Sequence, residues 1–418
     1  MRIAVCDYSG HPFQVQLSRE LARRAHDVLH LTFAGFQTPK GALQWAPGDS
    51  PSLEIDAINL ASPFAKHSYV KRWKQERALG NLFVRRLQRF QPDVILGANF
   101  PLDTLSRVAK WASAENRAFV LWQQDIYSKA ITAIFAKRFG FAGRLIGSWY
   151  RHIERSVMRT SDATVVIDDS FKEAIRCEFR LGTAEVHVIE NWAPLNEITV
   201  QPKNNTWSRA QGLAHTPVVL YTGTLGLKHN PGLLLRLAES LRNDPAVQIV
   251  VTSEGPGADW LAEQSKTKGL ANIRVLPFQP YHLYPAVLGT ADVVVAMLEA
   301  DAGSFSVPSK ILSYMAGGKA IALCAPQENL ATRLVAVNGT GITVPPDDAD
   351  AFCAAVTTLL SDDARRADAS RASRAYAERA FDLGAIADRF EQILLRAQTQ
   401  KSSQRRYGRK WAAHAQQA

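Results

Sequence analysis

Cysteine is scarce in this sequence, and the few cysteines lie far apart. Among 418 residues there are four, and no two of them form a CxxC pair. This spacing excludes a disulfide framework and argues against a structural zinc site, and it indicates a reducing compartment. The four are Cys6, Cys177, Cys324 and Cys353.

Long apolar runs are also lacking. None approaches the roughly 18 residues that a membrane-spanning helix needs, and the shorter run 291–298 predicts a buried strand. The first residues hold a short apolar run that ends at Asp7, which predicts a strand rather than a signal peptide. We therefore expect a soluble or peripheral protein of the cytoplasm.

Acidic residues are almost absent from two basic segments, which together carry more charge than the net +10 of the chain. Segment 66–89 has eight basic residues and one acid, and the tail from residue 397 has five and none. Apolar residues interleave the first segment at helical spacing, which predicts a basic amphipathic helix on an anionic membrane. A solvated helix face over a domain core explains the same pattern. No nucleic-acid motif accompanies the charge, so we expect no nucleic-acid partner. The basic residues are Lys66, Lys71, Arg72, Lys74, Arg77, Arg85, Arg86 and Arg89, then Lys401, Arg405, Arg406, Arg409 and Lys410.

Length and composition predict two globular domains. The chain is too long for one ordinary core, and its 46% of hydrophobic residues supports sizeable cores. Strand-like runs alternate with helical patterns in both halves, which indicates an α/β protein with two doubly wound, Rossmann-like domains. The polar segment 201–214 predicts the linker between them. The strand-like runs are 2–6, 28–33, 93–96, 119–122, 163–167 and 186–189, then 217–223, 247–252, 273–276, 292–298, 320–324 and 341–344.

The loops after the second-half strands are chemically unusual. Segment 306–319 predicts a phosphate cradle that opens a helix, because Pro308 suits a first helical turn and Lys310 adds positive charge there. An ordinary capped helix with a surface lysine explains the same spacing. The turn 222–228 has two glycines that permit close approach of a diphosphate. We expect these loops to line a cleft between the two domains, at the carboxyl ends of their strands.

Eight segments carry a resemblance to a known family. They are 122–125 and 188–192 in the first half, and 221–226, 229–231, 272–277, 290–293, 307–310 and 314–319 in the second. They resemble retaining nucleotide-sugar glycosyltransferases of the GT-B fold, family 4 type, in particular the polysaccharide-assembly subgroup of the WcaI and WbuB kind. Two positions depart from the family pattern: Ser313 replaces a glutamate that holds the ribose, and Thr224 replaces a common arginine.

The resemblance implies a domain plan. It predicts an acceptor-side domain over residues 1–198 and a nucleotide-sugar-binding domain over 199–380. A C-terminal helix over 381–396 would pack back on the first domain. Composition predicts that the basic tail, 397–418, is disordered.

The resemblance also implies site residues. Lys228 and Lys310 would neutralise the leaving diphosphate without a metal or other cofactor. Asp125 would orient or deprotonate the acceptor hydroxyl, and a helix N-cap is its alternative role. Gly10 and His11 would shape the acceptor side, although a turn explains them as well. The predicted donor-binding residues are Thr222, Gly223, Thr224, Glu254, Gly255, Phe278, Gln279, Asp301, Gly303, Ser304, Phe305, Ser306, Ser309 and Ser313.

The resemblance implies a hexosyl- or N-acetylhexosaminyl-transferase that uses a UDP- or GDP-sugar and retains the anomeric configuration. Together with the basic segment 66–89, it predicts a lipid-linked saccharide acceptor at the inner face of a bacterial plasma membrane. Exopolysaccharide, capsule or O-antigen assembly is the process we expect. Two alternatives stay open: a sugar-nucleotide epimerase of the same fold, and a non-catalytic nucleotide-sugar-binding regulator, which the missing glutamate favours.

Overall fold

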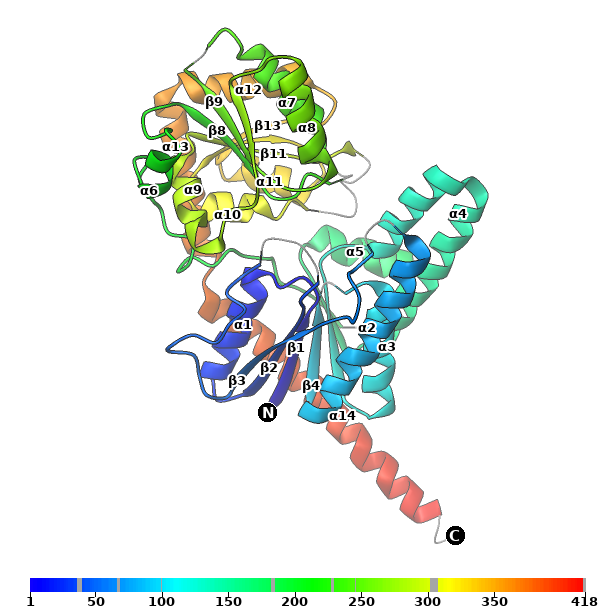
Figure 1. Cartoon of the computed structure of the whole chain (residues 1–418). Coiled ribbons are helices and arrows are strands. Elements are labelled where there is room, and N and C mark those ends of the chain that lie inside the picture. Colours follow the sequence, from blue (N-terminus) through cyan, green and yellow to red (C-terminus); the bar gives the residue numbers. More distant parts are fainter. Residues whose placement is uncertain are drawn as a thin grey trace. The chain divides into compact units, whose positions relative to one another are not determined.

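The computed structural model describes residues 1–35, 40–65, 68–98, 100–181, 185–226, 229–244, 246–300 and 307–415, with side chains up to residue 403. The chain divides into two compact units (Figure 1). The first joins Met1–Glu190 to Leu383–Ala418, and the second is Asn191–Asp382. Each unit holds a parallel sheet with helices packed on it, so the predicted α/β architecture is confirmed.

The first unit contains a seven-stranded sheet in the order β3-β2-β1-β4-β5-β6-β7. Every residue of β4 and β5 is buried, as expected for parallel strands covered by helices. The strand order reverses between β1 and β4, where open α/β sheets bind ligands at the carboxyl ends of their strands. The strands are β1 (Arg2–Asp7), β2 (Asp27–Phe33), β3 (Leu53–Ile58), β4 (Val94–Ala98), β5 (Ala118–Gln123), β6 (Ala163–Val166) and β7 (Val186–Val188), and the helices are α1 (Pro12–Arg23), α2 (Tyr69–Phe90), α3 (Leu102–Ala114), α4 (Tyr127–Thr160), α5 (Asp169–Phe179) and α14 (Leu383–Ala415).

The second unit repeats this plan with a six-stranded sheet in the order β10-β9-β8-β11-β12-β13. Its strand order reverses between β8 and β11, which marks the corresponding ligand position. Its strands are β8 (Val218–Thr222), β9 (Gln248–Thr252), β10 (Ile273–Leu276), β11 (Val293–Met297), β12 (Ala320–Cys324) and β13 (Gly341–Val344). Its helices are α6 (Thr206–Ala210), α7 (Pro231–Ser240), α8 (Pro256–Thr267), η1 (Tyr281–Leu283), α9 (Tyr284–Thr290), α10 (Lys310–Ala316), α11 (Leu330–Val337), α12 (Ala349–Ser361) and α13 (Asp363–Ala380).

The segment predicted as the interdomain linker, 201–214, is not entirely loop. It contains α6, whose first turn is fixed by Asn205. The Asn205 side chain accepts hydrogen bonds from the backbone N–H groups of Trp207 and Ser208, at 2.9 and 3.0 Å, and the Ser208 hydroxyl accepts from the Asn205 N–H. This reciprocal capping box stabilises a helix too short to show helical periodicity in the sequence.

The basic segment 66–89 forms α2 in its described part, which begins at residue 68. The apolar side of α2 packs into the first unit, with Leu79, Phe83 and Leu87 fully buried. The interpretation as a helix face over a domain core is therefore the one that the structure supports for this stripe. The predicted membrane helix lacks a continuous free apolar side, because the large apolar side chains that it exposes, Tyr69, Val70 and Trp73, all lie near its start.

The C-terminal helix α14 belongs to the first unit. Phe390 is buried against Trp122, with ring centroids 4.6 Å apart, and Glu391 pairs with Arg24 at 2.9 Å. The helix continues past residue 396, whereas the sequence predicts disorder from residue 397. Lys401 explains part of this difference, because its ammonium pairs with Asp162 at 3.1 Å. Among the described residues, no helix combines the length and apolar character that crossing a membrane requires.

Candidate functional site

The turn after β8 brings a glycine and a lysine together at the point where the strand order reverses. Gly223 has φ +104°, a left-handed conformation that favours glycine. A Cβ at this position would lie 3.4 Å from Cε of Lys310, so the missing side chain leaves room for the lysine. The predicted donor residues Gly223 and Lys310 are thus neighbours at the carboxyl end of β8.

The Lys310 ammonium lies over the face of a buried tyrosine. Its Nζ is 3.6 Å from the ring centroid of Tyr221, within the range of a cation–π interaction. The Tyr221 hydroxyl donates a hydrogen bond to the carbonyl of Thr224 at 3.0 Å, which ties the ring to the same turn. Tyr221 therefore holds both the cation and the turn, a role that its place inside a strand did not reveal.

The helix that follows Ser309 is short. α10 starts at Lys310, and Ser309 is its N-cap residue but makes no side-chain capping bond. Pro308 precedes this N-cap residue, so it lies just outside the helix, whereas the sequence predicts it in the first helical turn. Ser309 is exposed, and its side chain is open to solvent beside Lys310.

Two further tyrosines connect α9 and α10 to β8. The buried Tyr314 hydroxyl accepts a hydrogen bond from the Thr222 N–H at 3.0 Å and donates to the Val295 carbonyl at 3.2 Å. The Tyr284 hydroxyl lies 3.2 Å from Thr222 Oγ1 and also bonds the Ser313 side chain. Ser313, which replaces the family glutamate, is thus part of a hydroxyl network. Burial raises the pKa of both tyrosines, so the network is neutral.

The predicted residues of the next two loops make contacts within their own unit. Glu254 accepts a hydrogen bond from the Phe278 N–H at 3.3 Å, which joins the loops after β9 and β10. Gln279 accepts from the Trp207 indole at 3.0 Å, so its side chain anchors α6. Gly255 precedes α8 with φ +108°. These loops lie at the carboxyl edge of the same sheet as Lys310.

Six predicted residues lie outside the described part of the chain. They are Lys228, Asp301, Gly303, Ser304, Phe305 and Ser306. Their roles stay predictions, as does the phosphate cradle to which Ser306 would contribute.

In the first unit, Asp7 organises the loop that contains Gly10 and His11. Its carboxylate, buried at the carboxyl end of β1, accepts hydrogen bonds from the N–H groups of Ser9 at 2.9 Å and His11 at 2.7 Å. Burial raises the pKa of Asp7 to about 7, although these N–H groups and the charge of Lys40 act to lower it. The sequence predicts only that Asp7 ends a strand.

Asp125 follows β5 and is half-buried. The helix N-cap of α4 is Ile126, so the alternative role of Asp125 as the cap is wrong. The capping carboxylate is Glu154, which is buried and accepts hydrogen bonds from the N–H groups of Tyr127 and Ser128, both at 3.0 Å. Asp125 is thus left next to the carboxyl edge of the sheet without a capping role. Burial raises the pKa of Glu154.

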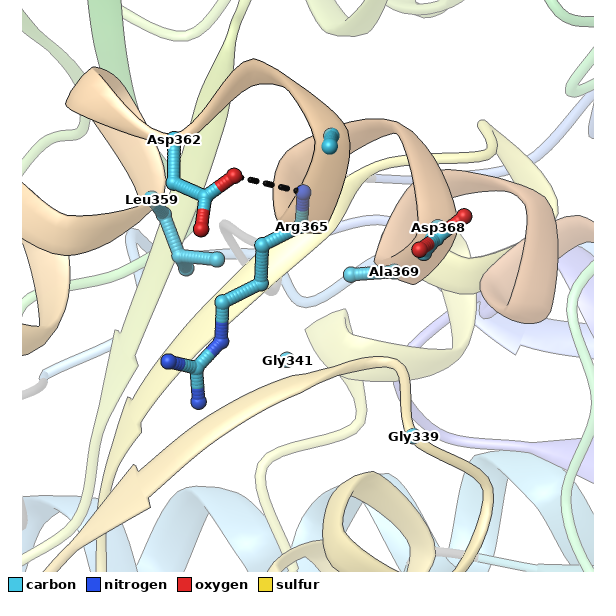
Figure 2. Close-up of a pocket in the computed structure, with 8 residues that line it drawn as sticks. Gly339, Gly341, Leu359, Asp362, Arg365, Asp368 and Ala369 are labelled. Carbon is cyan, nitrogen blue, oxygen red and sulfur yellow. Dashed lines mark hydrogen bonds between the residues drawn. The ribbon is translucent and has the colours of Figure 1, made fainter.

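One surface pocket of the second unit lies away from these residues. Figure 2 shows it between α12, α13 and the start of β13, where the Asp362 carboxylate accepts a hydrogen bond from the Arg365 N–H at 2.9 Å. Gly341, at the amino end of β13, lines it, so it opens on the edge of the sheet opposite to Lys310. Within the described ranges, no three His, Cys, Asp or Glu side chains are grouped closely enough to hold a metal ion.

Comparison with known families identifies the class. The family described as Glycosyl transferase 4-like domain matches residues 11–192, and the family described as Glycosyl transferases group 1 matches residues 204–376. Together the two matches span most of the chain. The chain therefore belongs to the group 1 glycosyltransferases that carry a 4-like domain, and its two parallel-sheet units are those of the GT-B fold.

Individual relatives agree with this assignment. The chain is 24% identical over 301 residues to the putative colanic acid biosynthesis glycosyl transferase WcaI of Escherichia coli K12. The aligned residues cover 71% of this chain and 72% of WcaI. Sucrose-phosphate synthase from Thermosynechococcus elongatus has a TM-score of 0.71 at 16% identity and covers 94% of this chain and 98% of its own. HepE of Anabaena, in complex with UDP and glucose, has a TM-score of 0.68 at 18% identity, with 94% and 99% covered. These structural likenesses concern the fold alone.

Proposed function

We propose that this glycosyltransferase moves a sugar from a UDP- or GDP-sugar to a saccharide acceptor, with retention, in the assembly of a bacterial polysaccharide. The relative WcaI, whose name refers to colanic acid biosynthesis, supports the process. The fold relative HepE, which holds UDP and glucose in its complex, supports the class of donor.

The observation that carries the proposal is the Lys310 ammonium at the turn after β8. When the sugar leaves, negative charge builds on the diphosphate, and a fixed cation stabilises that charge. Lys310 is held 3.6 Å from the centroid of Tyr221, beside a glycine turn that permits close approach of a ligand. We expect this cation to serve in place of a metal ion, so a chelator should leave turnover unchanged.

The acceptor is expected to bind at the carboxyl edge of the first sheet. Asp125 follows β5 there, and its carboxylate is free of a capping role, so it is available to orient or deprotonate an acceptor hydroxyl. Asp7 fixes the loop of Gly10 and His11 through two N–H hydrogen bonds. We propose a lipid-linked saccharide as the acceptor and the inner face of a bacterial plasma membrane as the place of reaction, because exposed cations remain on α2.

The test is a panel of labelled UDP- and GDP-sugars, incubated with the purified protein and a bacterial membrane lipid extract. We expect one donor to release its nucleotide only when lipid is present, with the label entering the lipid. Lys310→Ala should lower the rate about 100-fold or more, the usual effect of removing one group that stabilises transition-state charge. Lys266→Ala, which removes an exposed lysine of α8, is the matched control and should leave the rate unchanged.

Two other results would contradict the proposal. Interconversion of donor sugars without lipid would identify an epimerase. Saturable donor binding with neither release nor interconversion would identify a non-catalytic regulator. The anomeric configuration of the product, read by NMR, tests retention separately.

A further inference from the structure

Helix α4 is a hairpin of two packed arms. Gly140 has φ 56° and ψ −125°, which breaks the helix in its middle. A Cβ at Gly143 would collide with the backbone of Phe135, and one at Gly147 would collide with the Thr132 side chain. The two arms therefore touch through small residues, which leaves no space between them for large side chains. Figure 1 shows these arms extending beyond the sheet of the first unit.

The hairpin turns large apolar side chains outward. Phe141 is 75% exposed and Trp149 is 63% exposed, and Phe139 and Leu145 are exposed as well. Phe141, Leu145 and Trp149 follow one another at intervals of four residues, so they form one stripe on the second arm. We call these four residues the hairpin patch. A stripe of this kind costs free energy in water unless something covers it.

The arms that carry the hairpin patch are basic, although Lys129 and Arg151 form ion pairs with Glu178 of α5, at 2.8 and 3.7 Å. Segment 127–153 contains five basic residues and no acid. The Arg138 guanidinium lies 5.6 Å from the ring of Phe139 and 5.5 Å from that of Tyr69, which is exposed at the start of α2. Tyr69 also packs on Phe135, with centroids 4.8 Å apart, so α2 adds its first turn to this surface.

We propose that the hairpin patch inserts into the interface of an anionic lipid bilayer. Aromatic side chains favour the boundary between headgroups and acyl chains, and the surrounding cations favour anionic lipid. The inference rests on the proposed function, since a lipid-linked acceptor requires the enzyme at a membrane. It assigns the contact to α4, whereas the apolar stripe of α2 is buried.

The experiment measures flotation of the intact chain with vesicles of phosphatidylcholine, with and without phosphatidylglycerol. We expect binding only to the anionic vesicles, and less binding at high salt. The double variant F141S/W149S should bind at least tenfold more weakly, because two large apolar side chains no longer leave water. Val337→Ser is the matched control, since Val337 is 83% exposed on the second unit, and its binding should equal that of the unaltered chain.

Vesicle binding by F141S/W149S equal to that of the unaltered chain would overturn the inference. A second contradicting result would be an unaltered chain that is a dimer and a double variant that is a monomer with the same vesicle binding. The hairpin patch would then be the contact with a second copy of the chain. Turnover with a detergent-solubilised lipid acceptor tests the proposed function separately from vesicle binding. We expect F141S/W149S to retain that turnover, and an inactive unaltered chain that still binds vesicles through the patch would contradict only the proposed function.

Discussion

The contact between Lys310 and Tyr221 is the residue-scale basis of the proposed donor site. We expect Tyr221→Leu to lower kcat/KM for the donor about tenfold, because a cation–π interaction away from water contributes about 1–2 kcal/mol. Tyr221→Phe keeps the ring and loses only the hydrogen bond to Thr224, so its effect should be smaller. Steady-state kinetics on the two variants measure this difference. Equal effects of the two changes would show that the ring does not hold the lysine.

Asp7 should make the stability of the chain depend on pH. Its pKa rises from 3.8 to about 7 on folding because the carboxyl group is buried. The folded chain therefore binds the proton more tightly, so the free energy of unfolding should fall as pH rises from about 4 to about 7. Asp7→Asn should remove this part of the slope. Denaturant unfolding at several pH values across that window measures it, and identical slopes for the two proteins would contradict the assignment.

Some site residues could be predicted from the sequence, and others could not. Gly223 and Lys310 lie in recognisable motifs, so their spacing pointed to a donor site. The roles of Tyr314 and Glu154 could not be predicted, although Tyr314 lies in segment 314–319, because their partners are distant in the chain: Tyr314 bonds Thr222, and Glu154 caps the start of α4. A polar group inside an apolar pattern needs a partner, but the sequence does not say which one.

At the scale of elements, α4 depends on a cap that its own second arm supplies. Glu154→Ala would leave the buried N–H of Ser128 without its acceptor, and each such loss costs about 1–3 kcal/mol. We expect a loss of stability of that order or more, since the Tyr127 N–H loses the same acceptor. Thermal unfolding measures it. Glu115→Ala, at the exposed end of α3, is the control and should change stability little.

Helix α14 should contribute strongly to the first unit although it comes last in the chain. Phe390→Ala removes a buried ring that packs on Trp122, and such changes cost about 3–5 kcal/mol. Leu395→Ala, on the exposed side of the same helix, should cost less than about 1 kcal/mol. Chemical denaturation of both variants compares the two faces. A similar cost for both would mean that α14 does not pack as described.

Most strands could be predicted from their apolar runs, but β3 was missed. Two acidic residues, Glu54 and Asp56, interrupt its apolar pattern. In the structure both carboxylates form ion pairs with Arg86 of α2. The orientation of α2 was left open by its sequence, because a basic amphipathic helix suits a core and a membrane equally well. Its burial could be decided only by the sheet against which it packs.

At the scale of the whole molecule, two units of similar plan each place candidate residues where the strand order reverses. The second holds Lys310 of α10 beside the turn after β8, and the first holds Asp7 at the end of β1, with Asp125 two strands away, after β5. The sequence predicted this doubled architecture because alternating strand and helix patterns occur in both halves. Transfer between two substrates requires a site for each, which a fold of two such units can supply.

The most direct measurement follows nucleotide release and label transfer in one reaction that contains a single labelled nucleotide sugar and lipid extract. We expect one nucleotide to be released for each labelled sugar that enters the lipid, and Lys310→Ala should lower both rates together. Nucleotide release and transfer that are unchanged by Lys310→Ala would contradict this expectation.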